Sequence, residues 1–167
     1  GWEMVSQAFS RLPQSTEQIL HVDKYFSYEA PQKLTLPEFK SFLGPSWKRI
    51  DYDVNGEWGC YLILDEYLNN TAESKQAAAG WGGDQFVLYE AAGSDDAFVA
   101  QSTSWDTAAD AREFFDAYLK RTWKRYPDAK ETDVTSTTGR GERHRAVGAL
   151  GDRRDRLGTA VDVGVVG

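Results

Sequence analysis

Aromatic side chains divide this sequence of 167 residues into two unequal parts. The chain has 8 Phe, 8 Tyr and 6 Trp, and all of them lie within residues 1–138. Because large apolar side chains provide most of the area that a core buries, only this first part can fold around a core. We therefore predict one domain over 1–138. Since the sequence begins with Gly rather than Met, we interpret it as a fragment of a larger protein.

Residues 139–167 form a Gly/Arg-rich tail of different character, with seven of the 15 glycines of the chain. Three interpretations stay open. The tail is disordered and basic and binds an acidic partner. It is a loop followed by a strand over 159–166, where apolar residues alternate with others. Or it is translated out of frame. We predict an irregular tail and assign no function to it.

Hydrophobic periodicity within 1–138 predicts an α+β fold. The clearest element is a long amphipathic helix over 107–126, where apolar residues recur every three or four positions. Segments 85–91 and 96–103 alternate and are joined by a Gly-containing turn, as in a β-hairpin. The remaining predicted elements are helices at 3–12, 16–21, 38–43, 56–68 and 71–79, a strand at 47–52 and an extended stretch at 31–37. Together they predict a small, mostly antiparallel sheet covered by helices, with helix 56–68 buried on all sides.

Composition excludes several classes of protein. The chain carries 19 basic and 26 acidic residues, and this net charge of −7 is unfavourable for a nucleic-acid-binding protein. No apolar run approaches the roughly 20 residues that a membrane-spanning helix needs. The single cysteine, Cys60, excludes an internal disulfide and any metal site built from several cysteines.

Residues 51–56 (DYDVNG) match the first half of a calcium-binding loop. In such a loop the side-chain oxygens of Asp51, Asp53 and Asn55 surround the ion, and the final glycine allows the sharp bend. The twelfth position normally carries a bidentate Glu, but here it is Leu62. We therefore predict a weak calcium site and no other cofactor. The alternative is a strand-to-helix turn in which Asp53 or Asn55 caps the helix.

Residues 80–84 (GWGGD) are unusually rich in glycine. This pattern favours a glycine that ends a helix, followed by a tight turn that holds Trp81 in the core. The alternative is a binding site for a small ligand in an aromatic cleft formed by Trp58, Trp81 and Trp105, with Asp84 as a polar group.

No set of catalytic residues can be assembled from the sequence. The chain has two histidines and no HExxH motif, and Cys60 lies in an apolar run, so the sequence favours a non-catalytic protein without excluding an enzyme. We interpret His21 as a capping or packing residue and Asp65 as a partly buried carboxylate. Asn69 begins an N-x-T tripeptide that could accept a glycan on a surface loop.

Five short stretches carry a resemblance to known proteins: residues 13–21, 24–25, 56–57, 80–84 and 105–114. They resemble the C-terminal region of uncharacterised secreted proteins of haloarchaea and other prokaryotes. The upstream half of those proteins resembles a zincin-type metallopeptidase. The resemblance covers roughly residues 1–126. It implies a halophilic archaeal source and an extracellular or cell-surface location, and it supplies no catalytic residue.

We therefore predict a non-catalytic accessory or partner-binding domain of an exported, zincin-like protein. Its partner is expected to be the upstream half of the same protein or another polypeptide. The alternative is a stand-alone protein that binds a small ligand in the aromatic cleft.

Overall fold

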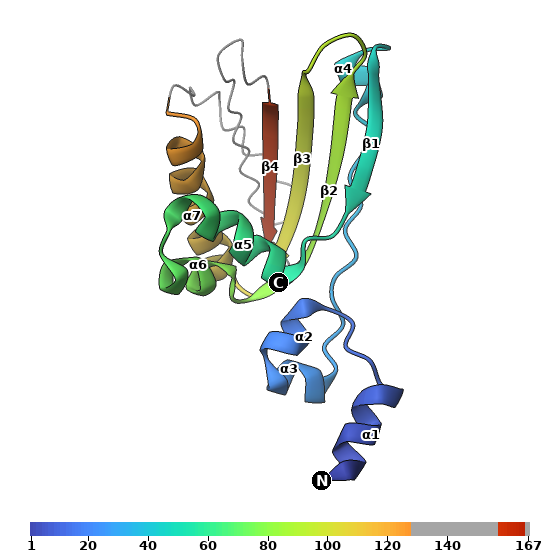
Figure 1. Cartoon of the computed structure of the whole chain (residues 1–167), viewed down its shortest axis with the longest axis vertical. Helices are drawn as coiled ribbons and strands as arrows, with labels where there is room; N and C mark the ends of the chain where they lie inside the picture. Colours follow the sequence, from blue (N-terminus) through green and yellow to red (C-terminus); the bar gives the residue numbers. More distant parts are fainter. Residues whose placement is uncertain (128–156, 166–167) are drawn as a thin grey trace.

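The computed structural model of the chain describes residues 1–127 and the backbone of residues 157–165. Its elements confirm the predicted α+β class (Figure 1). The strands are β1 (Trp47–Asp53), β2 (Trp81–Ala91), β3 (Ala97–Trp105) and β4 (Leu157–Val165). The helices are α1 (Trp2–Ser10), α2 (Thr16–Leu20), α3 (Val22–Ser27), α4 (Lys40–Leu43), α5 (Gly56–Leu68), α6 (Thr71–Ala78) and α7 (Ala108–Arg125). None of these helices in the described ranges has both the length and the apolarity of a membrane span.

The strands form one sheet in the order β1-β2-β3-β4. The β1–β2 and β2–β3 pairs are antiparallel, and β4 pairs in parallel with β3, so the sheet is mostly antiparallel as predicted. The prediction of an irregular tail is wrong for 157–165, because this backbone pairs along the whole of β3. It coincides with the alternating segment that one interpretation assigned to a strand. The proposed boundary at residue 139 and the out-of-frame interpretation concern residues that lie outside the described ranges.

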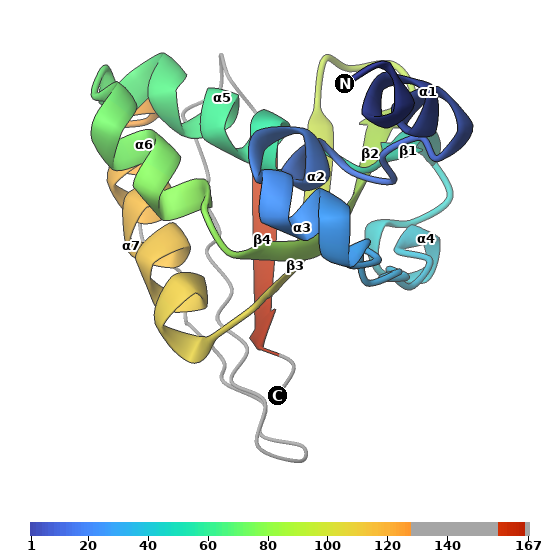
Figure 2. The same ribbon diagram turned by 90° about the horizontal axis from the view of Figure 1, so that it is seen from below.

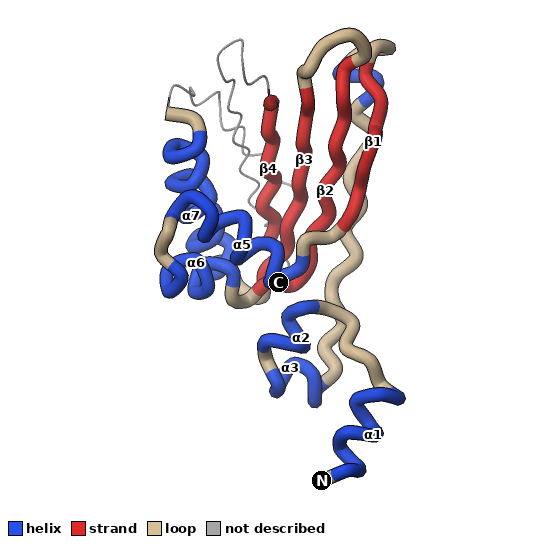
Figure 3. Tube along the Cα trace, in the orientation of Figure 1, coloured by secondary structure: helices blue, strands red, loops and turns tan. Residues whose placement is uncertain are grey.

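Helices α5, α6 and α7 pack together against one side of the sheet, near one end of its strands (Figures 1 and 3). The long amphipathic helix predicted at 107–126 is confirmed as α7, and the Thr107 hydroxyl caps it by accepting a hydrogen bond from the Asp110 N–H. The main core lies between these three helices and the sheet. Its largest buried side chains include Trp81, Trp105, Phe114 and Leu64.

Helix α5 has the predicted length, but the prediction that it is buried on all sides is wrong. It buries Cys60, Leu64 and Leu68, whereas Trp58 and Leu62 are about half exposed. The reason is its position in the outer layer, where one face of the helix meets the sheet and α7 while the opposite face meets solvent. An exposed apolar strip therefore remains on α5.

The other face of the sheet is covered by the chain between α3 and β1. Residues 31–37, predicted as an extended stretch, belong to no helix or strand and do not join the sheet. Backbone N–H groups of this segment donate to β2, from Gln32 to the Gly82 carbonyl at 2.7 Å and from Leu36 to the Gln85 side chain at 2.7 Å. A second, smaller core forms here around the buried residues Val87, Tyr89 and Ala100, with Phe39 and Trp47 packed against it.

Close approach of neighbouring groups explains two of the three glycines in residues 80–84, Gly80 and Gly83. Gly80 has a φ of +77°, and a side chain at this position would also overlap the carboxylate of Asp110. A Cβ at Gly83 would overlap the backbone carbonyl oxygen of Gln32. Trp81 is held in the core, as the favoured interpretation of this stretch predicted.

We predict that Gly83→Ala destabilises the protein by about 1–3 kcal/mol, because the added methyl group pushes the Gln32 backbone away from β2. The matched control is Gly82→Ala, whose Cβ would lie 3.5 Å from the Ser104 carbonyl oxygen, an ordinary contact. Urea unfolding monitored by circular dichroism gives both values. Equal losses in the two variants would contradict this account of Gly83.

Candidate functional site

Asp84 is a buried carboxylate near the start of β2, 2% exposed, that accepts five hydrogen bonds. Its Oδ2 accepts from the backbone and side-chain nitrogens of Asn55, both at 3.0 Å, and from the Gln101 amide at 3.3 Å. Its Oδ1 accepts from the Gly56 N–H at 2.9 Å and the Trp81 indole at 3.0 Å. Asp84 therefore satisfies N–H groups at the start of α5 and holds Trp81 in place, and it has no oxygen facing a ligand.

The structure does not bring the three predicted ligand-binding tryptophans together in a cleft. Trp81 and Trp105 are each 1% exposed, and the Trp105 indole donates to the Thr103 hydroxyl at 2.9 Å. Trp58 lies on the outer face of α5 and is 45% exposed. The predicted cleft is not formed because two of its three indoles belong to the core.

The residues of the predicted calcium loop form a strand-to-helix turn instead. Asp51 and Asp53 are exposed on β1, and each accepts a hydrogen bond from the backbone N–H of the following residue at 2.8 Å. The backbone and side-chain N–H groups of Asn55 both donate hydrogen bonds to Asp84. The chain enters α5 directly at Gly56, so Leu62 falls within a helix rather than closing an ion-binding loop. Asp84 takes the capping role that was expected of Asp53 or Asn55.

Two further predicted positions lie at the ends of α5 and α6. Asp65 is partly buried, as predicted, and its Oδ2 accepts a hydrogen bond from the Thr71 hydroxyl at 3.1 Å. Asn69 is exposed in the turn between the two helices, with a φ of +53°. Asn70 caps α6, because its side-chain oxygen accepts a hydrogen bond from the Glu73 N–H. Glycosylation at Asn69 remains a prediction.

A cluster of charged side chains, which we call the charged junction, connects α2 and α3 to the start of α5 and the end of β3. It consists of Glu17, His21, Lys24, Glu29, Glu57 and Asp106. The Lys24 Nζ lies 3.0 Å from Glu17 Oε1, 2.9 Å from Glu29 Oε1 and 2.6 Å from Asp106 Oδ2. Beside it, His21 Nε2 lies 2.8 Å from Glu57 Oε1.

Three carboxylates of the charged junction have the spacing of metal ligands. Oxygen atoms of Glu17, Glu29 and Asp106 lie within 4.8 Å of one another. However, the Lys24 ammonium is ion-paired with all three of them. The chain thus supplies the positive charge that a metal ion would bring, and the arrangement is better suited to fixing α3 in position than to binding a cation.

Burial changes the acidity of the two innermost carboxyls. It raises the pKa of Glu17, and the hydrogen bond and charge of Lys24 only partly oppose this. Burial likewise raises the pKa of Glu57 against the effect of His21, and Glu57 Oε2 has no hydrogen-bond partner among the described residues. Partial burial lowers the pKa of Lys24, but hydrogen bonds to Asp106, Glu29 and Glu17 outweigh it and raise the pKa above its ordinary value.

The fold brings together the separate stretches that carry the resemblance described above. Residues 17–24 and 57 contribute to the charged junction, and Gly56 and Asp84 meet in the adjacent hydrogen-bond network. Sequence reasoning missed the junction. The sequence feature that could have indicated it is the four-residue spacing of Glu17 and His21, which places two ionisable side chains on neighbouring turns.

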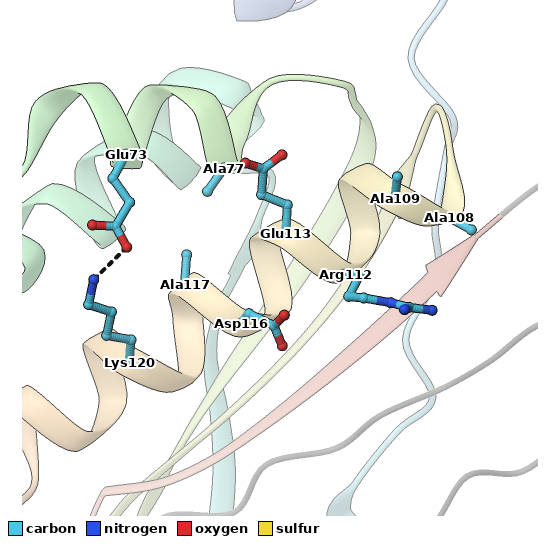
Figure 4. A pocket seen from close by; sticks show the side chains of 9 residues that line it. All are labelled: Glu73, Ala77, Ala108, Ala109, Arg112, Glu113, Asp116, Ala117 and Lys120. Atoms are coloured by element: carbon cyan, nitrogen blue, oxygen red, sulfur yellow. Dashed lines mark hydrogen bonds and ion pairs between the residues drawn. The ribbon is translucent and has the colours of Figure 1, made fainter.

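A surface hollow of about 650 Å³ lies between α6 and α7 (Figure 4). Four alanines and five charged side chains line it, and of the charged ones Glu73 and Lys120 form an ion pair at 2.6 Å. The lining residues are Glu73, Ala77, Ala108, Ala109, Arg112, Glu113, Asp116, Ala117 and Lys120. No aromatic side chain lines this hollow, so it is not the predicted aromatic cleft.

Comparison with known proteins identifies a family. The model of the family described as "Domain of unknown function (DUF8575)" matches residues 43–161, from the end of α4 into β4, and the chain belongs to this family. No curated protein and no solved structure matches the chain.

We predict that Lys24→Met destabilises the protein by roughly 2–4 kcal/mol, because it leaves three neighbouring carboxylates without their counter-charge. Lys120→Met is the matched control. Its ion pair with Glu73 is largely exposed, so little change is expected. Denaturant unfolding of both variants at pH 7 measures the difference. A Lys24 variant as stable as the Lys120 variant would show that the junction contributes nothing.

The raised pKa of Glu17 predicts a particular pH dependence. The folded protein holds this proton more tightly than the unfolded chain, so stability falls as pH rises from the ordinary carboxyl range near 4.3 through the raised pKa. Glu17→Gln should remove this loss. Glu73 behaves in the opposite way. The hydrogen bond from Lys120 lowers the pKa of Glu73, so the stability that this carboxylate contributes is lost as pH falls through the lowered pKa, and Glu73→Gln should remove that loss. Unfolding free energies between pH 3.5 and 7 test both signs; parallel curves for the two variants would refute them.

Proposed function

We propose that this chain is a non-catalytic domain that binds a polypeptide through an apolar surface on α1, α2 and α3. In this proposal it is the accessory part of an exported, zincin-like protein, and the zincin-like half is its partner. The observation that carries the proposal is the exposure of α1. Every residue of this helix is exposed, including Trp2 at 86% and Phe9 at 80%.

Helix α1 is too short to be stable in water without packing. It has nine residues, and isolated helices shorter than about 12–15 residues are marginal even with favourable sequences. Among the described residues, the hydrogen bonds from the rest of the chain reach the turn after α1, where the Tyr25 and Tyr28 hydroxyls donate to the carbonyls of Arg11 and Leu12 at 2.8 and 3.0 Å. Figure 1 shows α1 set apart from the sheet and from α5–α7. A partner surface would supply the missing packing.

Exposed apolar side chains also occur on the neighbouring helices α2 and α3. On α2 and α3 the exposed apolar side chains are Ile19, Leu20, Val22 and Phe26. Within α1 itself the only charged side chain is Glu3. These features support an uncharged, apolar polypeptide surface as the partner and give no reason to expect a nucleic acid or a charged ligand.

The test is a calorimetric titration of the chain with the separately produced zincin-like half. We expect saturable binding with a negative heat-capacity change, weakened at least tenfold by Trp2→Ser combined with Phe9→Ser. Phe42→Ser is the control, since Phe42 is similarly exposed at 79% but lies on α4. Absence of binding by the unaltered chain, or equal weakening by the control, would reject the surface. Hydrolysis of casein by the chain alone would reject the non-catalytic role.

A further inference from the structure

We propose that β1 is a self-association edge, at which two copies of this chain pair their β1 strands antiparallel about a two-fold axis. The sheet order β1-β2-β3-β4 places β1 at an edge, so one side of its backbone has no strand partner among the described residues. Six of its seven residues are exposed, and only Trp47 is partly buried. An edge of this kind offers unpaired N–H and C=O groups to another strand.

The order of charges along β1 selects its partner. The strand begins with Lys48 and Arg49 and ends with Asp51 and Asp53, so its first half is basic and its second half acidic. Two strands with this order attract each other when they run antiparallel and repel when they run parallel. A second copy of β1 therefore has the complementary charge order, and a two-fold axis makes every favourable pair occur twice.

The β1–β2 register shows which side chains share a face. Lys48 and Asp53 pair with Glu90 and Phe86 and lie on the face toward α5. Arg49 and Tyr52 pair with Tyr89 and Val87 and lie on the opposite face, where the Arg49 guanidinium lies 5.0 Å from the Tyr52 ring. A β-bulge at residue 50 separates the two halves of the strand.

One register of the paired strands satisfies both faces. When Lys48 lies opposite Asp53 of the second copy, Arg49 lies opposite Tyr52 of that copy, and each pair shares a face. The symmetry axis then passes between residues 50 and 51, beside the bulge of each strand. Charged side chains and a bulge protect an edge strand from arbitrary pairing, so these features also restrict the partner to a strand with the reversed charge order.

Lys48 and Asp53 are the best positions for a test because, among the described residues, neither side chain forms a hydrogen bond or ion pair with a residue distant in sequence. Lys48 does lie opposite Glu90 of β2, so the fold of each variant has to be checked. Asp53 accepts only the N–H of Val54 in its own turn. Arg49, in contrast, forms an ion pair with Glu38 at 2.6 Å, so its substitution would also disturb the monomer. Since a seven-residue edge buries little area, we expect a weak dimer with a dissociation constant on the order of 10–100 µM.

The experiment is sedimentation equilibrium of the whole chain from 5 to 500 µM in low salt. We expect a monomer–dimer equilibrium that Lys48→Asp weakens at least tenfold, since it places two acidic residues opposite each other twice per dimer. The exchanged variant Lys48→Asp/Asp53→Lys has the same net charge as the natural chain and should restore the dimer. Circular dichroism and thermal unfolding confirm that each variant is folded.

Three outcomes would overturn the proposal. One is a chain that remains monomeric at 500 µM. Another is a dimer that Lys48→Asp leaves unchanged or that the exchanged variant fails to restore. The third is a dimer that Trp2→Ser/Phe9→Ser abolishes while Lys48→Asp does not, which would assign self-association to α1. Loss of the β1 dimer leaves polypeptide binding by α1 untouched, so the two proposals fail separately.

Discussion

The buried carboxylate of Asp84 is the group on which the arrangement of this domain depends. It belongs to β2, yet its hydrogen-bond donors come from the start of α5, from the indole of Trp81 and from Gln101 on β3. Removing the carboxylate would leave several N–H groups buried without acceptors, and each such group costs about 1–3 kcal/mol. Because α6 and α7 pack on α5, the position of the whole helical layer follows from where Asp84 holds the first turn of α5.

The charged junction is connected to the hydrogen bonds of Asp84 through two consecutive residues of α5. Gly56 donates to Asp84, and Glu57 pairs with His21, so two consecutive residues connect the first turn of α5 to the core and to α2–α3. Lys24 makes a second connection to Asp106, immediately before the turn into α7. A shift of α5 would therefore disturb both sets of contacts together. Figure 2 shows α2 and α3 lying across the end of the sheet, where these contacts form.

The sequence predicts the elements of this fold better than its contacts, because periodicity is local. The pattern of 107–126 specifies a helix whatever surrounds it, and α7 follows it closely. Nothing local links Lys24 to Asp106, which lies 82 residues away, or His21 to Glu57, which lies 36 residues away. Those pairs exist only once the fold has brought α2 and α3 against the start of α5 and the end of β3.

The local nature of sequence patterns also explains why the predicted tryptophan cleft is not formed. A tryptophan beside glycines is compatible with a ligand cleft and with a core, and only the layer above it decides between them. Trp81 and Trp105 lie beneath α5–α7 and are buried, whereas Trp58 lies on the outer face of α5 and stays half exposed. The calcium pattern is local in the same way, since residues 51–56 contain the ligand types of a calcium loop but continue directly into a helix.

The elements that we propose for recognition contribute little to the core. Helix α1 buries no residue, and β1 has only Trp47 partly buried. Folding free energy therefore comes mainly from β2, β3 and α5–α7, and the exposed side chains of α1 and β1 that make no ion pair can change with little effect on stability. Elements that lie outside the core also favour association, because α1 is an unpacked apolar helix and β1 is an edge strand without a strand partner on one side among the described residues. The net charge of −7 opposes indiscriminate contact between copies, so association requires a surface that is either apolar, as on α1, or locally complementary in charge, as on β1.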